Sequence, residues 1–312
     1  MKKLVTLSVA TVIASLLLVG CASTSEKTET STDAKMTVTD SLGEKVDVSQ
    51  NPEKVVVFDN GSLDTLDALG VGDSVVGAAT DSLPNYLSDY KNVDSAGGIK
   101  EPDVEKINSL NPGLILISGR QQDYKDQLNA IAPTLYLDSS SGDYWEKTQT
   151  NVTTLAKIFN KEDEAKKEIA SLQKNIDSLR SKAEASSQKA LILLVNDGSL
   201  SAYGAGSRFG VIHDDFGFAQ ADENIEVSTH GQSVSYEYVL EKNPDIIFVI
   251  DRSQAIGEDT SKDNISENEL IKETNAGKNN KIVTLQPDVW YLSGGGLEST
   301  KLMIEDAEKA LD

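Results

Sequence analysis

The hydrophobic and polar positions of residues 105–120 recur 132 positions later, in residues 237–252. The first copy reads EKINSLNPGLILISGR and the second reads EYVLEKNPDIIFVIDR, so a glutamate, an Asn-Pro pair, an isoleucine and an arginine coincide. Each copy predicts a helix, a turn at Asn-Pro and a short apolar strand. A β-branched apolar run of this length is typical of a parallel sheet that is covered on both faces.

Each predicted strand ends in an arginine, Arg120 in the first copy and Arg252 in the second. In open α/β sheets, ligands bind beyond the carboxyl ends of the strands. The repeat therefore predicts two similar lobes that each present an arginine to a shared cleft. Two unrelated α/β units would share the apolar pattern as well, but they would not explain the matched glutamates, Glu105 and Glu237.

The rest of the first half alternates between strand and helix patterns. Predicted strands cover residues 36–40, 45–48, 55–58, 75–79 and 133–138. The first two should form a hairpin around Ser41-Leu42-Gly43, and a helix is predicted at residues 62–69, started by Gly61-Ser62 and stopped by Gly70.

Residues 145–185 contain no proline or glycine, and their apolar residues recur at helical spacing. They predict one long helix, with a break near Asn160 left open. An unbroken helix of this length would span on the order of 55–60 Å, enough to connect two lobes as a stiff hinge. A coiled-coil dimer is the alternative, but the apolar spacing is not a sustained heptad, so we expect a monomer.

The second half begins again with a predicted strand at residues 190–195, followed by GAGSRFG at residues 204–210. A strand, a glycine turn and a helix would suit a dinucleotide, but the third glycine is one position late for GxGxxG and Arg208 occupies the turn. After a predicted strand at residues 282–285 comes WYLSGGG, in which we expect Trp290 to be packed and Tyr291 to face a cleft.

The two histidines have different surroundings. His213 follows apolar Val211 and Ile212 and precedes two aspartates, which predicts a structural role with satisfied hydrogen bonds. His230 lies in the polar stretch STHGQS just before the second copy of the repeat, where a ring nitrogen can face a cleft.

The first residues form a targeting segment. Lys2 and Lys3 precede an apolar run, which predicts a signal peptide over residues 1–20. The run ends in Leu-Val-Gly-Cys, which resembles the bacterial lipobox, so we expect Cys21, the only cysteine, to be lipidated. Residues 21–35 carry no large apolar residue and predict a disordered tether. An N-terminal lobe at 36–144, a connecting helix at 145–186 and a C-terminal lobe at 187–312 should follow.

The formal net charge is −21, and removal of Lys2 and Lys3 with the signal peptide would make it −23. This acidity argues against a nucleic-acid partner, since neutralising phosphates requires clustered Lys and Arg. A locally positive cleft could still bind a small anion. A hydrolase or oxidoreductase is a remote alternative, because no catalytic Ser/His/Asp or Cys/His motif and no intact cofactor fingerprint is present. We therefore expect no catalytic residues and no intrinsic cofactor.

Four stretches together are similar to ferric-siderophore-binding lipoproteins of ABC importers, in the catecholate branch that includes petrobactin-type binders. They are residues 204–217, STHGQSVSYEYV, the IDR strand end and WYLSGGG. The similarity extends over the chain from about Met36. It implies an α/β, class III periplasmic-binding-protein-like fold, with two Rossmann-like lobes joined by a single long helix and an iron(III) catecholate in the cleft between them.

The resemblance also implies roles for single residues. Arg120, Arg208 and Arg252 match the ligand-binding arginines of these proteins. His230 and Tyr291 match the pair that completes the coordination of iron(III) when the siderophore supplies only four oxygens. Arginine remains charged and can donate paired hydrogen bonds to catecholate oxygens, while phenolate and imidazole are suitable iron ligands.

By the same resemblance, Glu105 and Glu237 match the acidic residues that dock on the permease, although a carboxylate at a helix start can also have a structural capping role. The implied location is outside the cytoplasm, anchored to the cell membrane by lipid. Haem, cobalamin and ferric hydroxamates remain alternative ligands of the same fold. Because three implied ligand residues, Arg208, His230 and Tyr291, lie in the second lobe, we expect that lobe to dominate selectivity.

Overall fold

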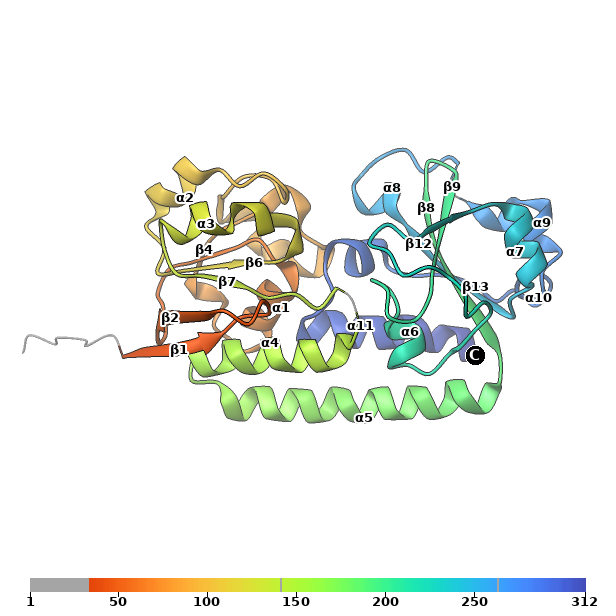
Figure 1. Cartoon of the computed structure of the whole chain (residues 1–312), viewed down its shortest axis with the longest axis horizontal. Coiled ribbons are helices and arrows are strands. Elements are labelled where there is room, and N and C mark those ends of the chain that lie inside the picture. Colours follow the sequence, from red (N-terminus) through yellow and green to blue (C-terminus); the bar gives the residue numbers. More distant parts are fainter. Residues whose placement is uncertain (1–33, 141, 263) are drawn as a thin grey trace, which may run out of the picture. The chain divides into compact units, whose positions relative to one another are not determined.

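A computed structural model of the chain describes residues 34–140, 142–262 and 264–312 (Figure 1). These residues belong to one compact unit. The predicted signal peptide, Cys21 and nearly all of the predicted tether lie outside the described residues. In the part of the chain that is described, no helix has the length and apolar character needed to cross a membrane.

The first lobe contains a hairpin and a five-stranded sheet. The hairpin pairs β1 (Lys35–Thr39) with β2 (Lys45–Ser49), as predicted. The sheet has the order β5-β4-β3-β6-β7, and all of its pairs are parallel. Its strands are β3 (Val55–Val57), β4 (Val75–Ala78), β5 (Asp94–Ser95), β6 (Leu114–Ile117) and β7 (Thr134–Tyr136). The helices of this lobe are α1 (Asn60–Ala68), α2 (Val104–Leu110) and α3 (Lys125–Asn129).

Helix α1 begins at Asn60, earlier than the start that was predicted from Gly61-Ser62. The side chain of Asp59 accepts a hydrogen bond from the main-chain N–H of Ser62 at 2.8 Å and so caps the helix. Aspartate is among the preferred N-cap residues, because its carboxylate satisfies an N–H group that has no partner within the helix. The start at Gly61-Ser62 was therefore placed too late.

The second lobe contains a mixed sheet with the order β11-β9-β8-β12-β13, and β10 pairs with β8. β8 and β12, and β12 and β13, are parallel, whereas β9 is antiparallel to both of its neighbours. The strands are β8 (Lys189–Asn196), β9 (Ser199–Tyr203), β10 (Ala219–Gln220), β11 (Gln232–Val234), β12 (Ile246–Asp251) and β13 (Ile282–Thr284). The helices are α6 (Val211–Asp214), α7 (Tyr236–Lys242), α8 (Arg252–Ala255), α9 (Glu269–Lys272) and α10 (Asn275–Lys278).

The two copies of the repeat fold alike, as α2 with β6 and as α7 with β12. Each helix ends at an asparagine with left-handed backbone, Asn111 at φ 50° and Asn243 at φ 43°. Asparagine tolerates this conformation, and the proline that follows it cannot continue the helix. The Asn-Pro pair therefore stops the helix and turns the chain into the strand, which lies in the interior of its sheet in both lobes.

The long helical stretch consists of two helices, α4 (Tyr144–Ile158) and α5 (Glu162–Ser186). The break left open near Asn160 is present, because that residue has a left-handed backbone with φ 54°. The two helices lie side by side (Figure 1). α5 alone leads to β8, and its 25 residues correspond to a length of about 37 Å. The connection between the lobes is therefore shorter than the span on the order of 55–60 Å that an unbroken helix would have.

Apolar residues cover both faces of both sheets. One core on the first sheet includes Leu63 and Leu66 of α1, and the opposite face includes Ile107 of α2. The largest core joins the second sheet to α5 and to α11 (Leu297–Glu308), and it also includes Leu69 and Trp145 from the first half. The apolar interior therefore continues from one lobe to the other.

Candidate anion-binding site

Three arginines and one tyrosine from both lobes come together in the structure. Arg120 lies in a 3-10 turn (Gly119–Tyr124) directly after β6, and Arg252 is the first residue of α8, directly after β12. Arg208 lies in the loop between β9 and α6, and Tyr291 lies in a π-helical turn (Asp288–Leu292) after β13. All four residues are half-buried. We call them the arginine–tyrosine cluster.

The guanidinium groups of the cluster share Tyr291 as their hydrogen-bond acceptor. Arg120 Nη2 and Arg208 Nη2 donate to the main-chain carbonyl of Tyr291 at 2.7 and 2.5 Å. Arg252 Nε donates to the Tyr291 hydroxyl oxygen at 3.0 Å. The main chain of Tyr291 is thus held from both lobes, while its hydroxyl is held from the second lobe.

The same guanidinium groups lie over the phenol ring. The distances from the guanidinium carbon to the ring centroid are 4.5 Å for Arg208, 5.8 Å for Arg252 and 5.9 Å for Arg120. Cations within about 6 Å of an aromatic centroid are attracted by the ring quadrupole. Arg208 also lies 5.0 Å from the centroid of Phe209, so two rings orient this guanidinium.

Burial and neighbouring charges change the pKa values of the cluster. Burial, followed by the like charge of Arg208, lowers the pKa of Arg120 to about 10. Burial raises the pKa of Tyr291, but the hydrogen bond from Arg252 and the charges of the three arginines together outweigh it, so this pKa lies below its ordinary value. The phenol of Tyr291 is therefore easier to deprotonate than an isolated tyrosine.

The positive charge of the cluster is only partly neutralised. Among the described residues, the single ion pair of these arginines joins Arg252 Nη1 to Glu258 Oε2 at 3.6 Å, and the side chain of Glu258 is 60% exposed. Exposed pairs of this kind contribute little. The surplus of charge and of planar N–H donors suits an anionic ligand with several oxygen atoms.

Asn196 belongs to the site, although it was not predicted from the sequence. Its side-chain oxygen accepts a hydrogen bond from Arg252 Nη1 at 2.6 Å, which helps to orient that guanidinium. Asn196 is the last residue of β8, the strand next to β12. A polar residue at the end of a buried strand is the signal that singled out Arg252, and the same signal could have identified Asn196.

The comparison with known proteins agrees with this architecture. Residues 55–289 of the 312 match the family model described as periplasmic binding protein. The chain belongs to the periplasmic binding protein family. It is 45% identical over 316 residues to the petrobactin-binding protein YclQ of Bacillus subtilis (strain 168), and the match covers 100% of both proteins.

Solved structures of other binding proteins are similar as well. The iron uptake ABC transporter substrate-binding protein PiuA from Streptococcus pneumoniae is 48% identical with a TM-score of 0.85, covering 88% of this chain and 98% of that one. The periplasmic catecholate-siderophore binding protein VctP from Vibrio cholerae is 32% identical with a TM-score of 0.82, covering 88% and 100%.

The two histidines of this periplasmic binding protein differ in burial. His213 is held by a contact of 2.8 Å between its Nδ1 and the carbonyl oxygen of Phe218, and burial lowers its pKa, which agrees with the predicted structural role. His230 is exposed in the turn before β11, and within the described part of the chain it has no hydrogen bond or ion pair. It is not part of the hydrogen-bonded cluster, and its role as an iron ligand stays a prediction.

Glu105 and Glu237 occupy equivalent positions in the first turns of α2 and α7, and both are exposed. The N-caps of these helices are other side chains, Asp103 in α2 and Ser235 in α7. Neither glutamate forms an ion pair with another described residue. The Glu237 carboxylate also accepts hydrogen bonds from its own main-chain N–H and from the Ser235 side chain, which lower its pKa, so it contributes to capping α7.

The glycine-rich stretch at residues 204–210 does not resemble a dinucleotide site in its geometry. The helix that follows it, α6, has only 4 residues. The main-chain N–H of Gly206 donates to Asp214 Oδ2 at 2.7 Å, so an acidic side chain occupies the donor that a phosphate would need. The stretch instead positions Arg208.

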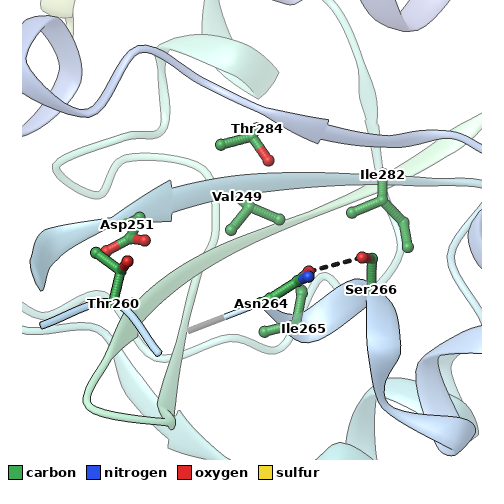
Figure 2. Close-up of a pocket in the computed structure, with 8 residues that line it drawn as sticks. All are labelled: Val249, Asp251, Thr260, Asn264, Ile265, Ser266, Ile282 and Thr284. Carbon is green, nitrogen blue, oxygen red and sulfur yellow. Dashed lines mark hydrogen bonds between the residues drawn. The ribbon is translucent and has the colours of Figure 1, made fainter. Parts of the chain in front are cut away.

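A cavity of about 270 Å³ lies elsewhere in the second lobe, beside β12 and β13 (Figure 2). Its lining residues are Val249, Asp251, Thr260, Asn264, Ile265, Ser266, Ile282 and Thr284. Ser266 Oγ donates to Asn264 Oδ1 at 2.7 Å within it. No residue of the arginine–tyrosine cluster lines this cavity, so we do not include it in the candidate site.

Proposed function

We propose that this protein binds an iron(III) catecholate siderophore outside the cytoplasm and delivers it to an ABC permease. The observation that carries the proposal is the arrangement of three guanidinium groups around Tyr291, opposed by a single exposed carboxylate among the described ion pairs. A ferric catecholate is strongly anionic, and its oxygens can accept the paired hydrogen bonds that arginine donates.

Tyr291 is suited to a second role, as a ligand of the iron itself. Its lowered pKa favours the phenolate, which is a hard oxygen ligand for iron(III). With a tetradentate bis-catecholate, Tyr291 and His230 would fill the two remaining coordination positions. Each of them loses a proton when it coordinates, so the affinity for a tetradentate complex should fall as the pH is lowered.

The named ligands of YclQ and VctP support a catecholate over haem, cobalamin or a ferric hydroxamate. YclQ is named for petrobactin and VctP for catecholate siderophores. The fold alone would not distinguish these ligands. The relatives are binding proteins of transport systems, and we propose the same non-catalytic role here, with no intrinsic cofactor.

A titration tests the ligand class directly. Ferric bis-catecholate, ferric hydroxamate and haem are each added to the protein while tryptophan fluorescence is followed. Trp290 adjoins Tyr291 and is 3% exposed, so an iron complex bound at the cluster should quench its emission. We expect saturable quenching with the catecholate complex. Quenching by haem or hydroxamate with no response to the catecholate would refute the proposal.

The coordination by Tyr291 has a spectroscopic test. In Tyr291→Phe, the ligand-to-metal charge-transfer band of the tetradentate complex should change, because one phenolate is lost from the iron. Tyr90→Phe is the matched control, since the Tyr90 hydroxyl donates to Asp67 at 2.6 Å and does not contact the cluster. A spectrum that is unchanged in Tyr291→Phe would remove Tyr291 from the iron.

Delivery to the permease is proposed to depend on Glu105 and Glu237. Replacing both with alanine should leave the affinity for the ferric complex intact and abolish uptake of the complex by cells. Replacing the exposed glutamates Glu168 and Glu223 provides a control of equal charge change. Loss of binding in the first double variant would show that Glu105 and Glu237 are not mainly docking residues.

We also propose that Cys21 carries the lipid that anchors a monomeric protein to the membrane. Support comes from the sequence Leu-Val-Gly-Cys after an apolar run. In Cys21→Ser, the protein should move from the membrane fraction to the medium or the periplasm. Retention of this variant in the membrane fraction would contradict lipid anchoring at that residue.

A further inference from the structure

A junction between α1 and the start of α11 connects the first lobe to the segment that carries Tyr291. Asp64 of α1 accepts two main-chain hydrogen bonds from the first turn of α11, from Glu298 to Oδ1 at 2.8 Å and from Ser299 to Oδ2 at 2.7 Å. First-turn N–H groups have no partner within their own helix, and the positive end of the helix dipole favours a carboxylate. Asp64, which is only 1% exposed, therefore caps α11 from a distant part of the chain.

Glycines make this close approach possible. Gly296 directly precedes α11, and a Cβ at this residue would lie 2.2 Å from Asp64 Oδ2. A Cβ at Gly61 of α1 would lie 2.3 Å from the carbonyl oxygen of Gly294. Neither position has room for a side chain. Gly296 also has no side chain with which to cap α11, so the cap is supplied by Asp64.

Two further contacts hold the residues between Tyr291 and α11 against the first lobe. Asn60 Nδ2 donates to the carbonyl oxygen of Leu292 at 2.9 Å. The hydroxyl of Tyr86, in the 3-10 segment Asn85–Asn92, lies 2.5 Å from Ser293 Oγ and donates to Asp64 Oδ2 at 3.3 Å. Tyr86 thus connects the Asp64 carboxylate to the residue that lies two positions after Tyr291.

The residues directly after Tyr291 are held in place mainly by contacts with other segments of the chain. Gly294 and Gly295 have φ values of 89° and 74° and carry no side chain, so their restraints come from main-chain contacts such as the hydrogen bond from Gly295 N–H to the Tyr144 hydroxyl at 2.7 Å. The side before Tyr291 is fixed because Trp290 Nε1 donates to Asp306 in the core. The side after Tyr291 is held by the junction with α1 and by Tyr144 of α4, in addition to the bonds that Arg120 and Arg208 donate to the carbonyl of Tyr291.

We propose that Asp64 is a positioning residue for Tyr291: by holding the first turn of α11 against α1, it keeps the phenol inside the arginine–tyrosine cluster. Without the carboxylate, two N–H groups of α11 lose their buried partner, and fewer contacts hold the glycine loop against α1. The phenol would then move relative to Arg252, which donates to its hydroxyl, and to Arg208, which lies over its ring.

The test measures the ionisation of Tyr291, which does not depend on the identity of the ligand. The protein is labelled with tyrosine carrying 13C at Cζ, the Tyr291 resonance is assigned with Tyr291→Phe, and its pKa is determined by NMR titration. In Asp64→Asn, an NH2 group replaces one of the two carboxylate oxygens and cannot accept a hydrogen bond, so one of the two N–H groups of α11 loses its partner. We expect the pKa of Tyr291 to rise toward the usual tyrosine value of about 10. Tyr86→Phe should cause a smaller rise.

Asp67→Asn is the matched control. Asp67 lies in the same helix, is exposed and accepts a hydrogen bond from Tyr90 rather than from α11. The Tyr291 titration should be unchanged in this variant, and an equal shift there would overturn the proposal. A lower free energy of unfolding in Asp64→Asn with an unchanged Tyr291 pKa would also overturn it, because Asp64 would then only stabilise the fold. If Asp64→Asn does not fold, an unchanged Tyr291 titration in Tyr86→Phe overturns the proposal.

A second measurement connects the junction to iron binding and rests on the proposed function. In Asp64→Asn, the affinity for ferric bis-catecholate should fall by about tenfold, the loss expected for one hydrogen bond to a charged group. Its charge-transfer band should shift in the same direction as in Tyr291→Phe. If the wild-type protein does not bind the ferric complex, the proposed function fails, while the tyrosine titration still decides the role of Asp64.

Discussion

The two lobes share one αβ unit but differ in the sheet around it. In both, an asparagine-capped helix leads into an interior strand that ends beside an arginine. The first sheet is parallel throughout, whereas the second contains the antiparallel strands β9 and β11. The repeat therefore extends only over a local unit, and it does not determine the topology of the sheet in which that unit lies.

The lobes also contribute differently to the site. The second lobe supplies Arg208, Arg252 and Asn196, and the hydroxyl of Tyr291 bonds to it. The first lobe supplies one cluster residue, Arg120, and most of the bonds that fix the loop after Tyr291. The proposed selectivity of the second lobe would therefore depend on positioning by the first. The predictions below test this division, beginning with the largest expected effect.

The arginines of the two lobes should differ in their importance for binding. Hydrogen bonds to charged groups contribute about 1.5–3 kcal/mol each, so Arg208→Ala with Arg252→Ala should weaken binding of ferric bis-catecholate by about 10²–10⁴-fold. Arg120→Ala should weaken it by about 10–100-fold on the same basis. Dissociation constants from fluorescence titration provide the measurement. Arg180→Ala is the control, because Arg180 donates to the carbonyl oxygen of Asp214 outside the cluster. Equal losses from the two lobes would contradict the division.

The junction made by the first lobe should depend on pH. Burial raises the pKa of Asp64 to about 6, against hydrogen bonds from Ser299 and Glu298 that lower it. In the unfolded chain an aspartate has a pKa of about 3.9. The folded state therefore binds the proton more tightly, and the contribution of Asp64 to stability is full below pH ~4 and decreases as the pH rises through about 6.

Urea unfolding at pH 4 to 7 would measure this effect. The free energy of unfolding of the wild type, minus that of Asp64→Asn, should fall by about 2–3 kcal/mol across the range. Other buried carboxyl groups, such as that of Asp59, remain in both proteins and cancel in the difference. A difference that does not vary with pH would show that Asp64 keeps an ordinary pKa.

The glycines of the junction provide the next test. Helix propensity alone predicts that Gly61→Ala stabilises α1 by up to about 1 kcal/mol. The added Cβ would lie 2.3 Å from a main-chain oxygen, which cannot move aside as a flexible side chain could. We therefore expect a net loss of about 1–3 kcal/mol in the free energy of unfolding. Gly98→Ala is the control, since no atom lies within 4 Å of a Cβ there. Stabilisation by Gly61→Ala would show that α1 and the glycine loop before α11 can separate without cost.

The two histidines of the second lobe allow the smallest effect to be measured. His230→Ala should weaken binding of a tetradentate ferric complex by about tenfold, or roughly 1.4 kcal/mol, and should leave a hexadentate complex unaffected. The thermal midpoint should not change, because His230 is exposed. His213→Ala should show the reverse, with lower stability and unchanged affinity, since His213 bonds to the main chain of Phe218. Unchanged tetradentate binding in His230→Ala would exclude this histidine from the iron.

Much of the cluster could be predicted because its members directly follow recognisable elements. Arg120 and Arg252 follow apolar strands, and the parallel pairing of β6 and β12 with their neighbours places such positions at the ligand-binding edge. Asp64 gave no comparable signal. It lies within a helix pattern, and the groups that it binds are 234 and 235 positions away.

The sequence alone determined the local secondary structure of the repeated unit. The spacing of apolar residues, the Asn-Pro stops and the arginines after the strands depend on neighbours a few positions apart, and they predicted the repeated unit and the residues that it presents. The tertiary structure decided which glycine would meet which carbonyl group, which carboxylate would cap α11, and which lobe would hold Tyr291. These outcomes depend on how α1 and α11 pack, and contacts between distant segments leave no periodic pattern in the chain.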